Sequence, residues 1–158
     1  METQHFTTRI GAPADVVWET MLEDSTYRIW ASVFSPGSYF EGSWLPGSEI
    51  RFLGAGDDDE PAGGMLGVIV EHRPHEFVSI EYTGQIVDGV ADTTSDDARQ
   101  WAGTHENYTF DESDGVTTLT VDIDVDDRYA DDFRQMWPRT LDKLKELAES
   151  EAAARTAE

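Results

Sequence analysis

The sequence predicts an α+β domain in which a curved antiparallel sheet of about six to seven strands packs under one long C-terminal helix, with two short helices near the N-terminus. Residues 116–124 alternate between polar and apolar side chains, which is the period-two pattern of a half-buried antiparallel strand. In residues 130–150, apolar side chains instead recur at three- and four-residue spacing, as on one face of a helix. A sheet with one apolar face and a helix with a broad apolar stripe can cover each other.

The N-terminal part of the chain is predicted to form a strand followed by two helices. Residues 4–10 are typical of the strand. Pro13 suits the start of a helix over residues 13–22, because its missing N–H would be unpaired there in any case. A second helix is expected over residues 25–31, where Ser25 could cap the first turn.

The middle of the chain is predicted to form a series of antiparallel strands. Pro74 cannot donate a hydrogen bond to a sheet, so it belongs to a turn between two of them. A clear hairpin surrounds residues 112–115, which read ESDG. The expected strands cover residues 38–41, 49–54, 65–72, 76–83 with an extension at 85–87, 104–111 and 116–124, and one helical turn falls within 95–101.

The last element is predicted to be one amphipathic helix over residues 130–150, which Pro138 is expected to bend. Residues 151–158 are rich in alanine, glutamate and arginine, and are expected to form a frayed tail. The sequence has no internal repeat and no linker. The chain of 158 residues is therefore predicted to form a single domain over residues 1–150.

The chain is strongly acidic, with 33 acidic and 11 basic residues and a net charge of −22. A charge of this sign repels phosphate backbones and anionic lipids, so neither a nucleic acid nor a membrane is an expected partner. The absence of cysteine excludes a disulfide framework and a thiolate metal site. No apolar run approaches the roughly 20 residues that span a bilayer. Because residues 1–10 also do not resemble a signal peptide, a cytoplasmic location is expected.

Two interpretations of the acidity stay open. A high-salt cytoplasm would favour a solvated acidic surface, because salt screens its self-repulsion, and the scarcity of lysine agrees with such halophile-like adaptation. Alternatively, the chain comes from an ordinary organism with an acidic proteome. The run DDDE at residues 57–60 is a candidate cation site, but it lacks the spaced ligands and the glycine of a calcium loop. No metal or cofactor is therefore expected.

Four short segments carry a resemblance to a known superfamily. They are residues 12–18 (APADVVW), 27–30 (YRIW), 67–74 (GVIVEHRP) and 118–121 (TLTV). On these segments the chain resembles the START-like, or SRPBCC, superfamily, whose helix-grip fold is also that of the birch pollen allergen. Within it, the chain is most similar to the branch related to the C-terminal domain of the activator of heat-shock protein 90 ATPase. The resemblance spans about residues 3–149 and implies the fold more closely than the function, because the superfamily includes lipid carriers, hormone receptors and polyketide cyclases.

A helix-grip fold implies that aromatic side chains converge on the gap between the sheet and the last helix. Tryptophan and tyrosine suit a ligand cavity there, because each offers a large apolar surface and one hydrogen-bonding group. Trp18 is expected to pack in the core instead, whereas Trp101 could serve as a lid or anchor its loop. The residues predicted to line the cavity are Trp30, Phe34, Trp44, Glu81, Trp101, Glu106, Tyr108, Phe133, Met136 and Trp137.

Two carboxylates fall on strands that are expected at the centre of the sheet, Glu81 and Glu106. Glu106 shares a strand face with Tyr108 and Phe110, so its side chain is expected to point inward. A carboxyl group buried in an apolar cavity would have a raised pKa and could act as an acid, a base or a hydrogen-bond acceptor. In the alternative, Glu106 lies near the end of the sheet and pairs with an arginine or with water.

The four histidines form no metal-binding motif and are expected at the surface. His72 and His75 bracket a turn, and His105 should point to the opposite face from Glu106. No serine lies in a nucleophile elbow, and the chain has no cysteine. No catalytic residue is therefore assigned.

Three functions stay open at this stage. The first, which the aromatic residues favour, is binding of a small hydrophobic or amphipathic molecule, such as a lipid, by a monomer or weak homodimer. The second is an enzyme of the polyketide cyclase or dehydratase type that uses Glu106 with Tyr108 or His105. The third is a chaperone-associated interaction protein, which would carry an exposed apolar patch on the sheet.

Overall fold

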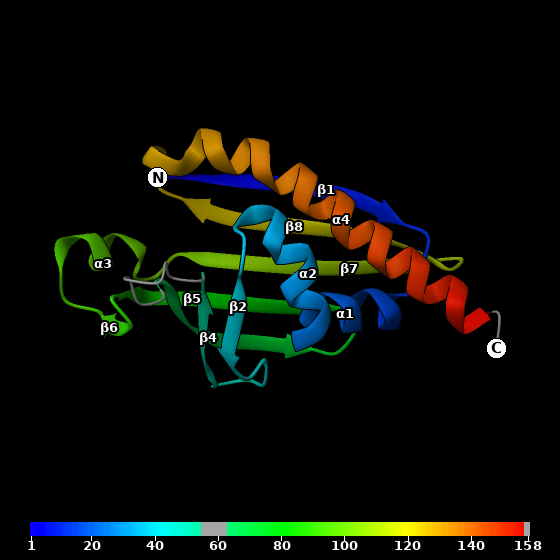
Figure 1. Cartoon of the computed structure of the whole chain (residues 1–158), viewed down its shortest axis with the longest axis horizontal. Coiled ribbons are helices and arrows are strands. Elements are labelled where there is room, and N and C mark those ends of the chain that lie inside the picture. Colours follow the sequence, from blue (N-terminus) through cyan, green and yellow to red (C-terminus); the bar gives the residue numbers. More distant parts are fainter. Residues whose placement is uncertain (55–62, 157–158) are drawn as a thin grey trace.

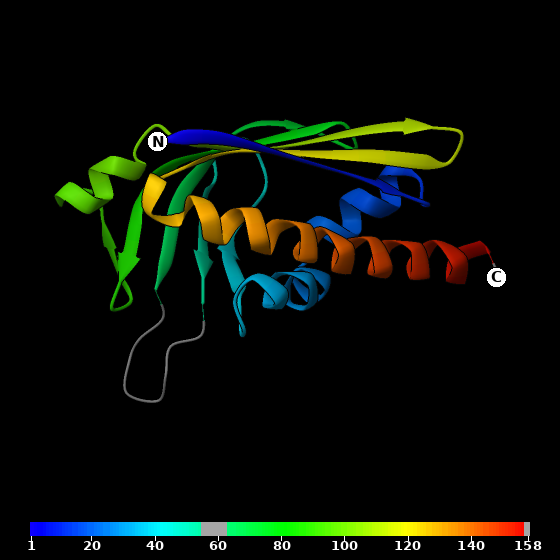
Figure 2. The same cartoon turned by 90° about the horizontal axis from the view of Figure 1, so that it is seen from above.

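An antiparallel sheet and a layer of helices make up the part of the chain that the computed structural model describes, residues 1–54 and 63–156. The long C-terminal helix crosses one face of the sheet, and the two N-terminal helices lie beside it on the same face (Figures 1 and 2). The predicted α+β helix-grip architecture is confirmed. The acidic run at residues 57–60 lies outside the described residues, so its interpretation as a cation site is not addressed.

Eight strands form the sheet within the described residues, and all neighbouring strands pair antiparallel. The first strand of the chain pairs with the last one, so these two strands lie side by side although they are far apart in the sequence. In sheet order the strands are β1 (Glu2–Ile10), β8 (Val116–Val125), β7 (His105–Ser113), β5 (Phe77–Val87), β4 (Gly64–Arg73), β3 (Glu49–Leu53) and β2 (Tyr39–Gly42), and β6 (Val90–Asp92) pairs with β5 off this path.

The helices that face the sheet are the first two and the last, and α2 packs directly against α4. The short α3 instead lies at one end of the sheet, next to β5 (Figure 1). None of the helices in the described ranges combines the length and the apolar character needed to cross a bilayer. The helical elements are α1 (Ala14–Leu22), α2 (Asp24–Phe34), α3 (Asp96–Trp101), a 3-10 turn (Asp127–Tyr129) and α4 (Ala130–Thr156).

The helix α4 is longer than the sequence predicted. It continues through Pro138 and past residue 150 to Thr156, so the stretch expected to be a frayed tail is helical up to that residue. Arg155 explains part of the extension, because its guanidinium pairs with Glu151 one turn back and with Glu19 of α1. The contact with α1 joins two helices that lie far apart in the sequence.

The start of α2 also differs from the prediction. The helix begins at Asp24, with Glu23 at the cap position, so Ser25 lies within the first turn and does not cap it. The negative charge of Asp24 in the first turn is favourable next to the positive end of the helix dipole. This charge takes the place of the hydrogen bond expected from serine.

Strand pairing decides which residues face the helices. On β7, Glu106 stands opposite Ile80 of β5 and Ile123 of β8, and all three are buried. The adjacent residue His105 stands opposite Glu81, and both are partly exposed on the other face. Side chains alternate along a strand, so a single residue separates the cavity face from the solvent face.

The strand β4 contains two irregularities that bend it. Its pairing with β5 shifts register between Leu66 and Gly67 and again between Ile69 and Glu71. Such bulges increase the local bend and twist of a strand. Strands β3, β4 and β5 curve toward the helices at the end of the sheet that carries α3 (Figure 2, teal and green).

The outer face of the sheet is polar. On β8, for example, the half-buried positions between the core residues are threonine and aspartate. The exposed large apolar side chains of the described residues form no continuous row on this face, although Val87 and Val90 stand opposite each other where β5 pairs with β6; they are Met1, Ile29, Leu45, Val70, Val87, Val90 and Tyr129. Apart from the strand residues Val70, Val87 and Val90, these side chains come from the N-terminus, loops and helices.

The packing of α4 predicts a large effect for one substitution. Leu144 is fully buried beneath the sheet, so Leu144→Ala should lower the free energy of unfolding by about 2–5 kcal/mol through lost burial and the resulting cavity. Urea denaturation measures the change. The control is Leu45→Ala, at a leucine that is 61% exposed, which should change stability by less than about 0.5 kcal/mol. Equal effects at both positions would contradict the described packing of α4.

Candidate functional site

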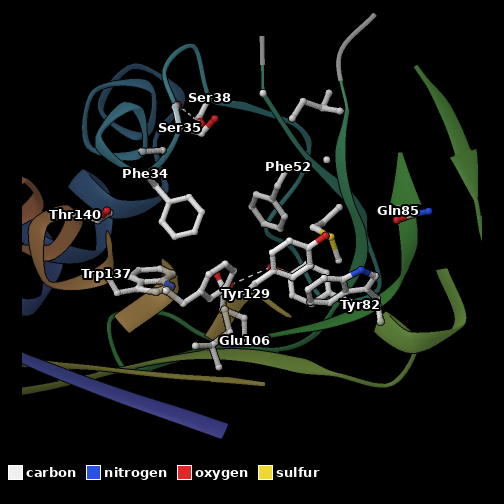
Figure 3. Close-up of a pocket in the computed structure, with 18 of the residues that line it drawn as sticks. Phe34, Ser35, Ser38, Phe52, Tyr82, Gln85, Glu106, Tyr129, Trp137 and Thr140 are labelled. Atoms are coloured by element: carbon white, nitrogen blue, oxygen red, sulfur yellow. Dashed lines mark hydrogen bonds between the residues drawn. The ribbon is translucent and has the colours of Figure 1, made fainter. Parts of the chain in front are cut away.

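A cavity of about 480 Å³ lies between the inner face of the sheet, α2 and the N-terminal part of α4 (Figure 3). Cavities that bind small molecules typically enclose about 300–1,000 Å³, so this one can hold a compact ligand. The lining is dominated by ten aromatic residues: Tyr27, Trp30, Phe34, Phe52, Tyr82, Trp101, Tyr108, Tyr129, Phe133 and Trp137.

Most of the side chains that the sequence predicted for the cavity are brought together by the fold. Seven of the ten line it, and they come from α2, α3, β7 and α4: Trp30, Phe34, Trp101, Glu106, Tyr108, Phe133 and Trp137. Phe34 of α2 and Phe133 of α4 pack edge to face, with 5.1 Å between ring centroids. Trp101 stacks on the partly exposed Tyr129, so this pair borders both the cavity and solvent.

Three predicted residues do not line the cavity. Glu81 lies on the outer face of the sheet, where its Oε1 is 3.4 Å from Nε2 of His105. Trp44 is buried elsewhere in the core, against Phe40 and Phe52. Met136 is not part of the lining because its neighbour Trp137 takes the inward position on α4.

Glu106 is the central polar group of the cavity. The hydroxyl of Tyr82 donates to its Oε1 at 3.0 Å, and the hydroxyl of Tyr108 donates to its Oε2. Glu106 as a whole residue is 7% exposed, and no lysine, arginine or histidine of the described residues forms an ion pair with its carboxyl group. The alternative in which Glu106 pairs with an arginine is therefore wrong for the described residues, because two tyrosines bond this carboxyl group instead.

Burial decides how these three groups titrate. Loss of hydration raises the pKa of Glu106, and the hydrogen bonds from Tyr108 and Tyr82 offset only part of that rise. Burial, together with the nearby carboxylate, raises the pKa of both tyrosines well above 10. The tyrosines are thus neutral hydrogen-bond donors at physiological pH. Glu106 releases its proton at a higher pH than an exposed carboxyl group does.

The cavity holds few other polar groups. Ser38 donates its hydroxyl to the carbonyl of Ser35, and Thr140 donates to the carbonyl of Met136, so both hydroxyl hydrogens are used within the chain. The indole N–H of Trp137 is buried without an acceptor among the described residues. Each carboxylate oxygen of Glu106 can accept a further hydrogen bond, so a ligand could contact it directly.

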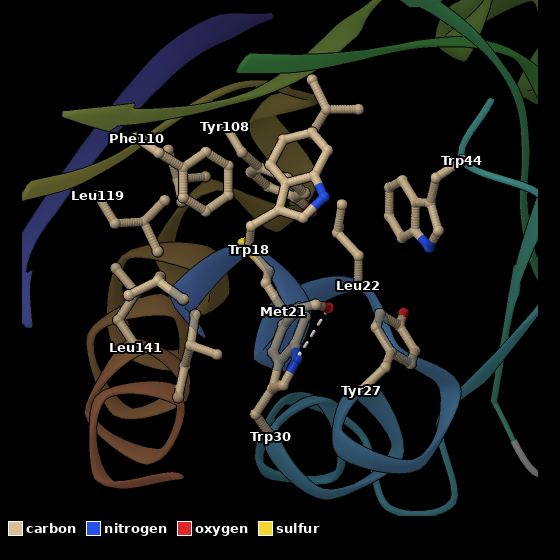
Figure 4. Close-up of a cluster of buried hydrophobic side chains, with 14 of the residues drawn as sticks. Trp18, Met21, Leu22, Tyr27, Trp30, Trp44, Tyr108, Phe110, Leu119 and Leu141 are labelled. Atoms are coloured by element: carbon tan, nitrogen blue, oxygen red, sulfur yellow. Dashed lines mark hydrogen bonds between the residues drawn. The ribbon is translucent and has the colours of Figure 1, made fainter. Parts of the chain in front are cut away.

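The two tryptophans of the N-terminal helices divide as expected. Trp18 of α1 packs in the core, edge to face with Phe110 at 5.2 Å (Figure 4). Trp30 of α2 lines the cavity, and its indole N–H donates to the carbonyl of Met21 at 3.2 Å. This hydrogen bond ties α2 to α1 and fixes the ring of Trp30 at the cavity wall.

Sequence reasoning missed several aromatic residues of the site, of which Tyr82 is the most important. A signal for it existed, because Val78, Ile80 and Tyr82 alternate along β5 and share the inner face. The same alternation places Glu81 outside. Phe52 and Tyr27 gave no comparable signal, because they come from two elements, β3 and α2, whose contact brings their rings together at the cavity.

Most of the sequence matches the model of one protein family. Residues 11–149 match the model of the family described as "Activator of Hsp90 ATPase homolog 1-like protein". The chain belongs to this family. Membership confirms the predicted resemblance to the START-like superfamily and to this branch of it. No curated protein matches the chain significantly.

Solved structures of similar fold cover nearly the whole chain. Protein MLL2253 from Mesorhizobium loti has a TM-score of 0.70 at 12% identity, over 94% of this chain and 98% of its own. The Aha1 protein from Colwellia psychrerythraea, solved as a dimer, has a TM-score of 0.67 at 16% identity, over 94% and 97%. DynU16, from the dynemicin biosynthetic locus, has a TM-score of 0.65 at 14% identity, over 96% of this chain and 49% of its own. At these identities the likeness shows the helix-grip fold.

The buried carboxyl group predicts a pH-dependent effect of Glu106→Gln. Because the pKa of Glu106 is raised, the folded protein keeps this proton at pH values where the unfolded chain has released it. The wild-type protein should therefore lose stability relative to the variant as the pH rises above the usual carboxyl value of 4.5. Urea denaturation between pH 4.5 and about 8 measures the difference.

Glu81→Gln is the matched control, because this carboxylate is 40% exposed on the opposite face. Its stability difference from the wild type should not show the same rise with pH. A flat difference for Glu106→Gln would contradict the assignment of Glu106 as a buried group whose ionisation opposes folding.

Proposed function

We propose that this chain binds one small, mainly apolar molecule in the cavity, oriented by a polar group that contacts Glu106. The observation that carries the proposal is the combination of ten aromatic side chains with one buried, tyrosine-bonded carboxyl group around about 480 Å³ of space. Apolar walls favour transfer of a hydrophobic molecule from water, and a single polar group favours one orientation.

Membership of the family supports the helix-grip fold and its cavity, but it does not identify a ligand. Helix-grip proteins share an architecture while their sites differ, so the function has to be argued from the cavity. The chaperone-associated alternative called for an apolar patch on the sheet, whereas the outer face is largely polar. The Colwellia relative is a dimer. For this chain a monomer or weak homodimer stays the expectation.

A second candidate function is proton transfer on a carbonyl compound, as in polyketide cyclases. The hydrogen bond between Glu106 and Tyr108 favours it, because it joins an acid of raised pKa to a neutral donor inside a cavity. The alternative pairing with His105 is wrong, because that side chain lies on the opposite face of β7. The similarity to DynU16 adds the context of a biosynthetic locus for a relative.

Ligand binding is tested with the neutral fluorescent probe N-phenyl-1-naphthylamine, whose emission increases in an apolar site. The wild-type protein should bind it, and a ligand at 100 times its dissociation constant should add about 2.7 kcal/mol to the stability. Ala31→Phe places a ring in the cavity, since Ala31 lines it, and should weaken binding at least about tenfold. Ala154→Phe, at an exposed site on α4, is the control for the added ring. Equal binding by both variants would place the probe outside the cavity.

Proton transfer is tested with 2-acetonaphthone, whose α-protons exchange with deuterium when a base removes them. The protein should accelerate this exchange, measured by proton NMR in deuterium oxide, and Glu106→Gln should abolish the acceleration because the amide cannot accept the proton. Glu81→Gln should retain it. Exchange at the uncatalysed rate in the wild-type protein would reject this second function and leave the binding function in place.

A further inference from the structure

We infer that the cavity selects ligands that carry a cationic nitrogen, either a protonated amine or a quaternary ammonium group, attached to an apolar body. This inference rests on the proposed binding function and names the chemical class of its ligand. Three independent features carry it: the charge of the lining, the hydrogen bonding of Glu106 and the aromatic walls.

Among the described residues, the lining has one inward-facing carboxyl group and no basic side chain. Glu106 supplies this carboxyl group, and no lysine, arginine or histidine is among the lining residues of the described chain. Asp124 also borders the cavity, but its side chain lies on the outer face of β8 and accepts hydrogen bonds from the hydroxyl of Thr3 and the backbone N–H of His105, whereas Glu106 faces the cavity. Of the charged side chains in the described ranges, Glu106 is the one that is buried.

The hydrogen bonds of Glu106 do not neutralise it. Tyr82 and Tyr108 each donate one hydrogen bond, but both hydroxyls are uncharged. A buried carboxylate is stable only when a positive charge compensates its lost hydration, and otherwise it takes up a proton. The raised pKa of Glu106 agrees with the lack of such a charge in the protein itself. A ligand that brings a cation would supply it.

The aromatic walls suit the same ligand. The faces of tryptophan, tyrosine and phenylalanine rings attract cations that lie within about 6 Å of the ring centre. Tyr108, which bonds Glu106, lies 6.5 Å from Trp137 between ring centroids, and Trp137 lies 5.9 Å from Phe34. A cationic nitrogen bound to Glu106 would therefore lie beside the ring of Tyr108 in a cavity whose walls are largely aromatic, while its apolar substituents fill the rest of that cavity.

The net negative charge of the whole chain also favours cationic ligands over anionic ones. A net charge of −22 raises the local concentration of cations around the protein and repels anions. Fatty acids and other apolar anions would meet this repulsion outside the cavity and the carboxylate of Glu106 inside it. Among lipid-like molecules, the structure thus favours amines over acids.

The test compares three probes that share one naphthalene ring system: the cation (2-naphthylmethyl)trimethylammonium, the neutral alcohol 2-naphthalenemethanol and the carboxylate anion 2-naphthaleneacetate. Their dissociation constants are measured by quenching of tryptophan fluorescence, since Trp30, Trp101 and Trp137 line the cavity. The cation should bind at least about tenfold more tightly than the alcohol, and the anion should bind most weakly. Measurement in 0.5 M KCl removes the attraction of the surface charge, because the Debye length then falls to about 4 Å.

Variants assign the preference to Glu106. Glu106→Gln should weaken binding of the cation at least about tenfold and change that of the alcohol less than about threefold. Glu81→Gln, whose carboxylate lies on the outer face, should leave both unchanged. Glu106→Asp keeps the charge at this position and should keep part of the preference, which separates a role of the charge from a general disturbance of the fold.

The possible results separate this inference from the function on which it rests. If the alcohol binds as tightly as the cation, and Ala31→Phe weakens both, the cavity binds ligands but the inference of a cationic ligand is overturned. A preference for the cation that Glu106→Gln does not reduce overturns it as well. If neither these probes nor N-phenyl-1-naphthylamine bind, the binding function and the inference fail together.

Discussion

Burial of the inner face of the sheet under α4 is the contact on which both the core and the cavity depend. Toward the C-terminal half of the helix, Leu141, Leu144 and Ala148 are at most 3% exposed, so helix and sheet meet closely there. Toward its start, Phe133 and Trp137 hold the layers apart, and α2 closes the side of the space between them. One helix thus fills the core at one end and leaves a cavity at the other, because its side chains change in size along the apolar stripe.

The cavity keeps a polar group where apolar packing would be more stable. Burial of Glu106 opposes its ionisation, and the two tyrosines reduce this cost without removing it. A hydrophobic residue at this position would fill space and need no partner. A group that lowers stability inside a ligand-sized cavity is typical of a functional site, where chemistry rather than packing determines the residue.

The sequence predicted the elements better than the contacts between them. Periodicity gave the hairpin of β7 and β8, the long helix and the inward position of Glu106, because each depends on neighbours along the chain. Tyr82 and Glu81 show the limit of periodicity. They are adjacent residues on β5, and side-chain alternation has to be followed residue by residue to see that Tyr82 faces the cavity and Glu81 faces outward. The contact of Arg155 with Glu19 could not be predicted, since it joins two helices far apart in the sequence.

His105 and Glu106 are adjacent on β7, so the register of this strand decides which of the two side chains faces the cavity. A slip of β7 by one residue against β5 and β8 would turn every side chain of the strand to the other face. An imidazole would then stand where the acid now faces the cavity, and the acid would reach solvent. Hydrogen bonding of β7 to both neighbouring strands therefore fixes more than its place in the sheet. It also keeps a carboxyl group, and not an imidazole, facing the cavity.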